Sequence, residues 1–194
     1  MPTGVALRDA QSQLFEAAER VLARDGAGGL TSRSVTDEAG VAKGVLHRHF
    51  DDFDDFLAEL VRRHVARVEA DLAGLAEVHQ VSSMVRALEV VFTPVTLELV
   101  RLTIARDGLR ARLRSSTPRG IPVLTEAAVA LAQRLRVETT RGPSATRVDP
   151  DTLARTLIGT GHLLFAGETP DTATVEEIVA AALQGGDGAS PAGG

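Results

Sequence analysis

Residues 31–50 read TSRSVTDEAGVAKGVLHRHF, and this stretch predicts a helix, a tight turn and a second helix. Thr31 can begin the first helix, because its hydroxyl can accept a backbone N–H that the first turn leaves free. Gly40 can end that helix, since glycine tolerates the left-handed conformation of a sharp reversal. The second helix mixes small side chains with hydrogen-bond donors, as a helix in the DNA major groove requires. We therefore interpret the stretch as a helix-turn-helix.

This motif supplies the candidate DNA contacts. Lysine and arginine can donate to phosphate oxygens or to guanine, and small residues let the backbone approach the groove. In the turn and the second helix the candidates are Ala42, Lys43, Gly44, Val45, His47, Arg48 and His49. At the start of the first helix they are Thr31, Ser32 and Arg33, beside the flanking DNA backbone.

The same stretch resembles the TetR (tetracycline-repressor) family of bacterial transcriptional regulators, and the detailed match covers about residues 10–60. The residues that fit the family pattern are Thr31, Val35, Ala39, Gly40, Val41, Lys43, Gly44, Leu46, His49 and Phe50. Other positions depart from it. Ala42 replaces a capping serine, His47 replaces a tyrosine and Thr36 replaces an alanine. Phe53 stands where the family often has a lysine that contacts phosphate.

The resemblance implies an all-α protein with a three-helix DNA-binding head at residues 1–50. A long fourth helix over residues 54–75 would join the head to a ligand-binding and dimerisation body at residues 76–184. The tail, residues 185–194, is expected to be disordered because it is rich in glycine. The implied function is a ligand-responsive homodimeric regulator, most simply a repressor that a small molecule releases from a palindromic operator.

Apolar periodicity predicts the remaining helices. They span residues 10–25, 81–93, 123–137 and 175–183, with Thr174 capping the last and with Gly26, Gly28 and Gly29 stopping the first. Pro94 either begins a new helix or kinks a continuous one in the apolar segment 94–114. Asp149 and Pro150 start a further helix. The segments 115–122 and 138–148 have the composition of loops.

Composition favours a globular protein in the cytoplasm. Of 194 residues 44% are hydrophobic and none is cysteine, which excludes disulfides and thiolate zinc sites. No signal peptide and no apolar run of membrane-spanning length is present in the sequence. The net charge is −5, and residues 1–50 contain six basic and six acidic side chains. This balance, with Phe53 and the aspartates after residue 50, leaves open a helical interaction protein with weakened DNA binding.

A metal site is a further alternative near the motif. Its ligands would be His47 and His49 with Asp51, Asp52, Asp54 and Asp55. Residues two apart on a helix diverge by about 200°, so the two histidines do not converge easily. The simpler reading is a helix start that the macrodipole stabilises. The sequence contains no catalytic motif that we recognise, and we expect neither a catalytic function nor a cofactor.

The family resemblance implies a ligand cavity among the fifth to eighth helices. Its candidate lining residues are Met84, Leu88, Phe92, Leu99, Leu124 and Leu131, with Thr96, Thr103, Arg106 and His162 as polar anchors. Any of these can instead belong to the core. The final two helices carry apolar residues suited to a contact between two copies, which are Leu157, Gly161, Leu164, Phe165, Val175, Ile178, Val179 and Ala182. About half of these are expected to face the chain's own core.

Overall fold

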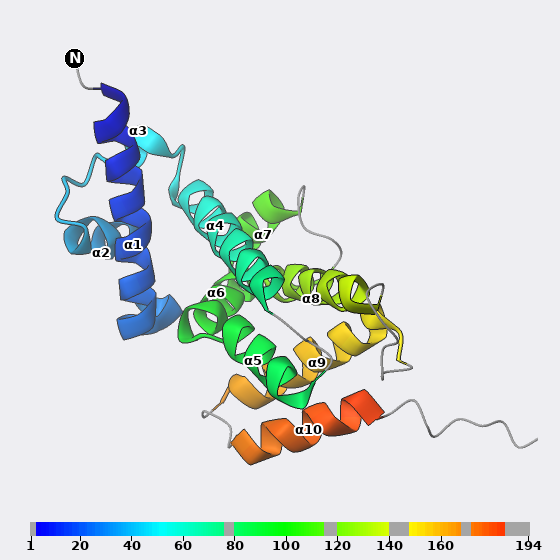
Figure 1. Ribbon diagram of the computed structural model, residues 1–194. Helices are drawn as coiled ribbons and strands as arrows, with labels where there is room; N and C mark the ends of the chain where they lie inside the picture. Colours follow the sequence, from blue (N-terminus) through cyan, green and yellow to red (C-terminus); the bar gives the residue numbers. More distant parts are fainter. Residues whose placement is uncertain (1–2, 76–79, 115–119, 140–147, 168–171, 185–194) are drawn as a thin grey trace, which may run out of the picture. The chain divides into compact units, whose positions relative to one another are not determined.

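The computed structural model describes residues 3–75, 80–114, 120–139, 148–167 and 172–184 (Figure 1). These residues form ten α-helices and no strand, which confirms the all-α fold. They fall into two compact units: residues up to His64 with Pro94–Val123, and Val65–Thr93 with the chain from Leu124 onward. The expected tail lies outside the described residues, as do most of the expected loops at 115–122 and 138–148.

Several elements of the first unit pack against its longest helix, α1. The elements of this unit are α1 (Thr3–Gly29), α2 (Ser32–Glu38), α3 (Leu46–His49), the N-terminal part of α4 (Phe53–Gly74), α6 (Pro94–Ala105) and α7 (Asp107–Leu113). α1 packs against α2, α3 and α6, with α6 at the end of α1 that leads into α2 (Figure 1). The Phe15 ring stacks on Phe56 with centroids 5.2 Å apart, and Phe50 meets both rings edge-on. This aromatic cluster joins α1 to the C-terminal end of α3 and to α4.

The local signals of the helix-turn-helix are confirmed. The Thr31 hydroxyl accepts a hydrogen bond from the Ser34 N–H at 3.0 Å, and the Ser34 hydroxyl accepts one from the Thr31 N–H at 2.9 Å. This reciprocal pair caps α2. Gly40 has φ 67°, and the N–H of Val41 donates to the Thr36 carbonyl at 3.1 Å, which closes the turn. Short-range chemistry thus sets the entry and exit of α2.

Other helix boundaries differ from those predicted. The start at residue 10 was wrong, because α1 begins at Thr3. The predicted stop at Gly26, Gly28 and Gly29 is confirmed in that Gly26 interrupts the helical backbone and α1 ends at Gly29, after one further turn. The apolar segment 94–114 forms two helices, since the backbone of Arg106 is extended between α6 and α7. Pro94 begins α6, one of the two alternatives. The cap at Thr174 was also wrong, because α10 already begins at Thr172.

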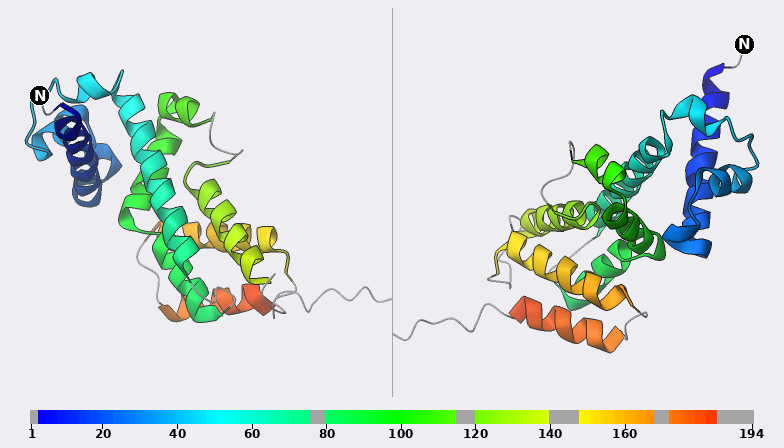
Figure 2. Two further views of the ribbon diagram at one scale, coloured as in Figure 1. Left: turned by 45° about the horizontal axis from the view of Figure 1, so that its top comes forward. Right: turned by 180° about the vertical axis from the view of Figure 1, so that it is seen from behind.

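The second unit contains the C-terminal part of α4, α5 (Val81–Val91), α8 (Leu124–Thr139), α9 (Pro150–Phe165) and α10 (Thr172–Gln184). α9 packs against α5, α8 and α10, and α10 also packs against α5 (Figure 2). Asp149 caps α9 as predicted, accepting from the Thr152 N–H at 2.9 Å. That hydrogen bond lowers the pKa of the Asp149 carboxyl below its ordinary value. None of the described helices is long and apolar enough to cross a membrane.

Candidate functional site

The turn and α3 present hydrogen-bond donors on an exposed surface. Lys43, His47 and Arg48 are exposed, whereas Leu46 between them is fully buried in the head. Among the other predicted DNA contacts, Thr31, Arg33, Ala42 and Gly44 are exposed, and Ser32, Val45 and His49 are half-buried. The buried leucine therefore fixes which face of α3 turns outward, where His47 and Arg48 are exposed, and Lys43 is exposed in the turn before the helix.

α3 is one turn long because its start lacks a side-chain cap. The Val45 N–H donates to the Ala42 carbonyl at 2.9 Å, and the Arg48 N–H donates to the Val45 carbonyl at 3.2 Å. Both bonds span three residues, so the segment enters α3 through a tighter turn. No side chain accepts a hydrogen bond at the helix start. Val45 at the N-cap position and Ala42 at the start of the turn both lack a side-chain oxygen for the free N–H groups, which is consistent with the short regular helix.

Most charges around α2 are already engaged within the head. Arg20 and Arg24 of α1 each bind Glu38 of α2 at 2.8 Å, and Arg33 lies 3.5 Å from Asp37. Arg20, then Arg24, lowers the pKa of the Glu38 carboxyl, while Asp25 and Glu38 raise the pKa of Arg24. These pairs join α1 to α2 and leave α2 with little net charge.

The aspartates after α3 act as a helix cap. Asp52 accepts a hydrogen bond from the Asp55 N–H at 2.8 Å, and Asp55 accepts one from the Asp51 N–H at 3.3 Å. The bonds satisfy N–H groups around the start of α4, where negative charge is also favoured by the helix dipole. Within the described residues, no group of three or more histidine or acidic side chains is placed to hold a metal ion.

Two of these aspartates also bind arginines from distant sequence. Arg106 donates from both Nε and Nη2 to Oδ1 of Asp54, at 2.9 and 2.6 Å. Arg112 of α7 donates to Asp52. The Arg106 guanidinium also lies 5.8 Å from the centroid of the Phe53 ring. Phe53, which replaces the phosphate-binding lysine of the family pattern, thus contacts an arginine of the same unit.

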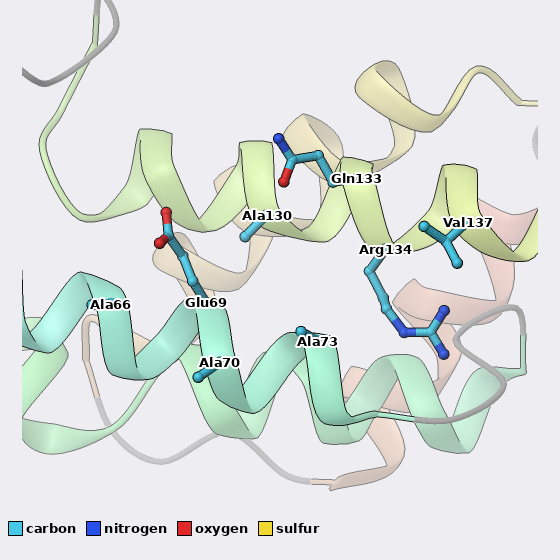
Figure 3. A pocket seen from close by; sticks show the side chains of 8 residues that line it. All are labelled: Ala66, Glu69, Ala70, Ala73, Ala130, Gln133, Arg134 and Val137. Carbon is cyan, nitrogen blue, oxygen red and sulfur yellow. The ribbon is translucent and has the colours of Figure 1, made fainter.

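A groove lies in the second unit between α4 and α8, with a volume of about 640 Å³ (Figure 3). Its lining residues are Ala66, Glu69, Ala70 and Ala73 of α4, with Ala130, Gln133, Arg134 and Val137 of α8. On both helices they recur at the spacing of one helical face, and the many alanines leave the space open. Arg134 donates from Nε to the Leu75 carbonyl at 2.7 Å, at the end of α4. Figure 3 shows Glu69 and Arg134 toward opposite ends of the groove.

The helix-turn-helix lies in a part of the chain that matches a known protein family. The family model for bacterial regulatory proteins of the tetR family matches residues 14–60, from the middle of α1 through α2 and α3 into α4. Over these residues the chain has the DNA-binding domain of the TetR family. The match supports a transcriptional regulator with a DNA-binding helix-turn-helix, as the sequence resemblance implied. No curated protein matches the chain in sequence.

Solved structures share the fold over nearly the whole chain. A TetR-family member from Streptomyces coelicolor is 25% identical, with a TM-score of 0.61 over 90% of this chain and 98% of that one. The multidrug binding protein EbrR, in complex with imidazole, is 27% identical, with a TM-score of 0.59 over 89% of this chain and 94% of that one. FadR from Bacillus subtilis, in complex with stearoyl-CoA, is 17% identical, with a TM-score of 0.62 over 90% of this chain and 98% of that one.

The residues predicted to bind a ligand are distributed over both units of this chain, and none lines the α4–α8 groove. In the first unit, Leu99 is fully buried, the Thr96 hydroxyl bonds His64 at 2.8 Å, and the Thr103 hydroxyl donates to the Val100 carbonyl. Arg106 binds Asp54. In the second unit, Met84, Leu88, Phe92, Leu124 and Leu131 are buried, and the half-buried His162 has an Nδ1 with no hydrogen-bond partner among the described residues.

Several residues predicted for the dimer interface belong to the core of the protomer. Leu157, Val175 and Val179 are buried, and Gly161 lies against the Phe92 ring, which stacks on Phe165 at 5.3 Å. Leu164, Phe165, Ile178 and Ala182 are half-buried. The most exposed large apolar side chain of α9 is instead Leu163, at 81%. Leu163 was not among the residues predicted for the interface, although an apolar side chain one turn after the small Gly159 suits a contact between two helices.

Proposed function

We propose that this TetR-family protein binds operator DNA as a homodimer and represses transcription until a small molecule releases it. The observation that carries the proposal is the free positive charge on the recognition surface. Lys43 and Arg48 are exposed and have no acidic partner among the described residues, whereas Arg20, Arg24 and Arg33 are engaged in ion pairs. Free cations beside a helix that fits the major groove are available for phosphates and base edges.

The direct test is binding to the promoter fragment next to the protein's own gene, measured by fluorescence anisotropy from about 50 to about 250 mM salt. Lys43→Ala and Arg48→Ala should each weaken binding and, for a phosphate contact, reduce the salt slope by about one. Arg155→Ala removes an exposed arginine from α9 and should change neither quantity. Unchanged binding by the Lys43→Ala/Arg48→Ala double variant would refute the assignment. Transcription from this promoter should rise when the gene is deleted, and a fall would indicate an activator.

The proposed dimer uses the outer face of α9. Leu163 is 81% exposed, and the exposed Gly159 one turn earlier has open space at its Cβ position. An apolar side chain beside a small residue suits close packing of two helices. Two-fold symmetry would place two copies of α3 in successive major grooves of a palindromic operator. Leu163→Glu should convert a dimer to a monomer in size-exclusion chromatography with light scattering, whereas Ile104→Glu, at a 48% exposed position of α6, should not.

The α4–α8 groove is the proposed effector site. Its volume lies within the usual range for ligand pockets, about 300–1,000 Å³. The solved relatives EbrR and FadR were determined with imidazole and stearoyl-CoA, so small molecules do occupy proteins of this fold. Glu69 lines the groove and has no ion-pair partner among the described residues, whereas the Arg134 guanidinium binds the Leu75 carbonyl. The Glu69 end of the groove therefore favours an effector with an apolar body and a positively charged group, since the charge of Arg134 lies toward the other end.

Two benzene derivatives of opposite charge test this site. Benzyltrimethylammonium should raise the midpoint of thermal unfolding, and benzoate should not, because only the cation complements Glu69. Glu69→Gln should remove the shift, and Ala70→Trp should remove it by filling the groove. Glu89→Gln, on an exposed face of α5, is the matched control. If the cation binds equally well to the Glu69→Gln and Ala70→Trp variants, the effector site lies elsewhere.

A further inference from the structure

The start of α4 places negative charge close to the proposed DNA contacts. Four of the five residues from Asp51 to Asp55 are aspartates, and they follow α3 directly. Asp52 is three residues after His49, so their Cα atoms are at most about 11 Å apart. This is similar to the Debye length of about 8 Å at physiological salt, so a charge here is only partly screened from a phosphate at α3. Uncompensated carboxylates would therefore oppose the attraction of Lys43 and Arg48 for DNA.

The two arginines compensate this charge from a different part of the chain. Arg106 binds Asp54 across 52 residues of sequence, and Arg112 binds Asp52 across 60. We name these four residues the Asp–Arg clamp. Both arginines lie in the segment Pro94–Val123, which belongs to the same compact unit as the helix-turn-helix. A segment outside the sequence of the head thus neutralises two of the four aspartates that follow α3.

Further contacts hold the clamp in place. A Cβ at Gly108 would lie 2.3 Å from Oδ2 of Asp54, so a larger residue there would have to move the Asp54 carboxylate from its present position. Arg62 of α4 reaches the Arg112 carbonyl at 3.5 Å, near the end of α7. Isolated surface ion pairs add little to stability, and the clamp side chains are 21–51% exposed. We therefore expect these ion pairs to affect DNA binding, through the charge near the duplex, more than they affect stability.

We propose that Arg106 and Arg112 are positioning residues for DNA binding, which keep Asp54 and Asp52 neutralised beside α3. This rests on the proposed DNA-binding function. With the clamp closed, the recognition surface carries the free charge of Lys43 and Arg48. With α7 displaced, two carboxylates face the same phosphates and the head repels DNA. The clamp is in this way an electrostatic gate, and any ligand that favours the displaced state of α7 lowers operator affinity.

The test uses the full chain and the promoter fragment described above. Arg106→Gln/Arg112→Gln should lower DNA affinity by about tenfold at low salt, with a smaller loss at high salt because repulsion is screened. Adding Asp52→Asn and Asp54→Asn to this variant should restore affinity to within about threefold of the wild type. Asparagine is as good a helix cap as aspartate, so the start of α4 is preserved. Arg106→Lys/Arg112→Lys keeps the charge and should bind close to the wild type.

The outcomes separate this inference from the proposed function. If Arg106→Gln/Arg112→Gln binds like the wild type while Lys43→Ala loses affinity, the gate is wrong and DNA binding stands. If the variant with all four substitutions binds DNA as weakly as the double variant, the contact is structural and the inference fails as well. If even the wild type shows no salt-dependent binding, the proposed function itself fails. Gly108→Ala gives a check that changes no charge, and it should also lower affinity by pushing α7 from Asp54, with circular dichroism showing the fold intact.

Discussion

The backbone N–H of Ala27 in α1 donates a 2.6 Å hydrogen bond to Oε2 of Glu98 in α6, across 71 residues of sequence. Gly26, immediately before, has φ 69° and ψ −173°, which interrupts the helix. The N–H groups after such an interruption have no helical acceptor, and a carboxylate at that point is also favoured by the helix dipole. Glu98 thus restarts the last turn of α1, from which the chain enters α2 through Leu30 and Thr31.

We predict that Glu98→Ala lowers the free energy of unfolding by about 1–3 kcal/mol, because the part-buried N–H of Ala27 loses a charged acceptor. The Glu98 side chain is 16% exposed, so water replaces the carboxylate only in part. Urea denaturation followed by circular dichroism measures the change. Glu89→Ala removes a 53% exposed glutamate of α5 and should stay within about 0.5 kcal/mol of the wild type. Equal effects of the two substitutions would contradict the role of Glu98.

The features that sequence predicted well are those decided within a few residues. The Thr31 cap, the left-handed Gly40 and the Asp149–Pro150 start each depend on a side chain and a backbone group less than one turn away. The kink at Gly26 was predicted as a helix end, because nothing nearby shows that Glu98 supplies the missing acceptor. Arg106 was predicted to hold a ligand, but its partner Asp54 is 52 residues distant. Pairings at such separations leave no trace in periodicity or spacing.

A second prediction compares two glycines of α9. A Cβ at Gly161 would lie 2.3 Å from the Phe92 ring, which is itself stacked on Phe165, whereas nothing lies within 4 Å of a Cβ at Gly159. Gly161→Ala should therefore destabilise the fold by about 1–3 kcal/mol through overpacking. Gly159→Ala should stabilise α9 by up to about 1 kcal/mol, because alanine favours the helix. Urea unfolding at one protein concentration measures both, and a loss of similar size in each would contradict this account.

The packing of α9 shows why the proposed dimer face could not be predicted from the sequence. Leu157, Gly161, Leu164 and Phe165 form a reasonable apolar stripe, but periodicity alone does not say whether a stripe meets the chain's own helices or a second copy. In the structure α5, α8 and α10 already cover the inner side of α9. Only the three-dimensional packing reveals that Leu163 is the apolar side chain left outside.

A third prediction concerns pH. The arginine partners lower the pKa of Glu38 below its ordinary value of 4.5, so the carboxylate stabilises the folded state above that value. This stabilisation is lost as the pH falls through the lower pKa of the folded state. The difference in urea midpoint between the wild type and Glu38→Gln should be constant from about pH 7 to about pH 5.5 and shrink toward about pH 3. Arg20→Gln/Arg24→Gln should abolish the same pH-dependent difference. A difference that grows on acidification would contradict the ion-pair assignment.

The short α3 leads to a last prediction. Ala42 begins the turn that leads into α3, at the position where the family pattern has a capping serine, and α3 has no side-chain cap. In Ala42→Ser the hydroxyl can accept the Gly44 or Val45 N–H, which should stabilise the protein by about 0.5–1 kcal/mol. A better ordered turn should also tighten DNA binding, because less entropy is lost when Lys43 and Arg48 are fixed on the duplex. Ala42→Val, which adds side-chain volume but has no oxygen, is the control. Urea midpoints and anisotropy titrations of the two variants separate a cap from a change of volume, and equal gains in both would show that capping is not the cause.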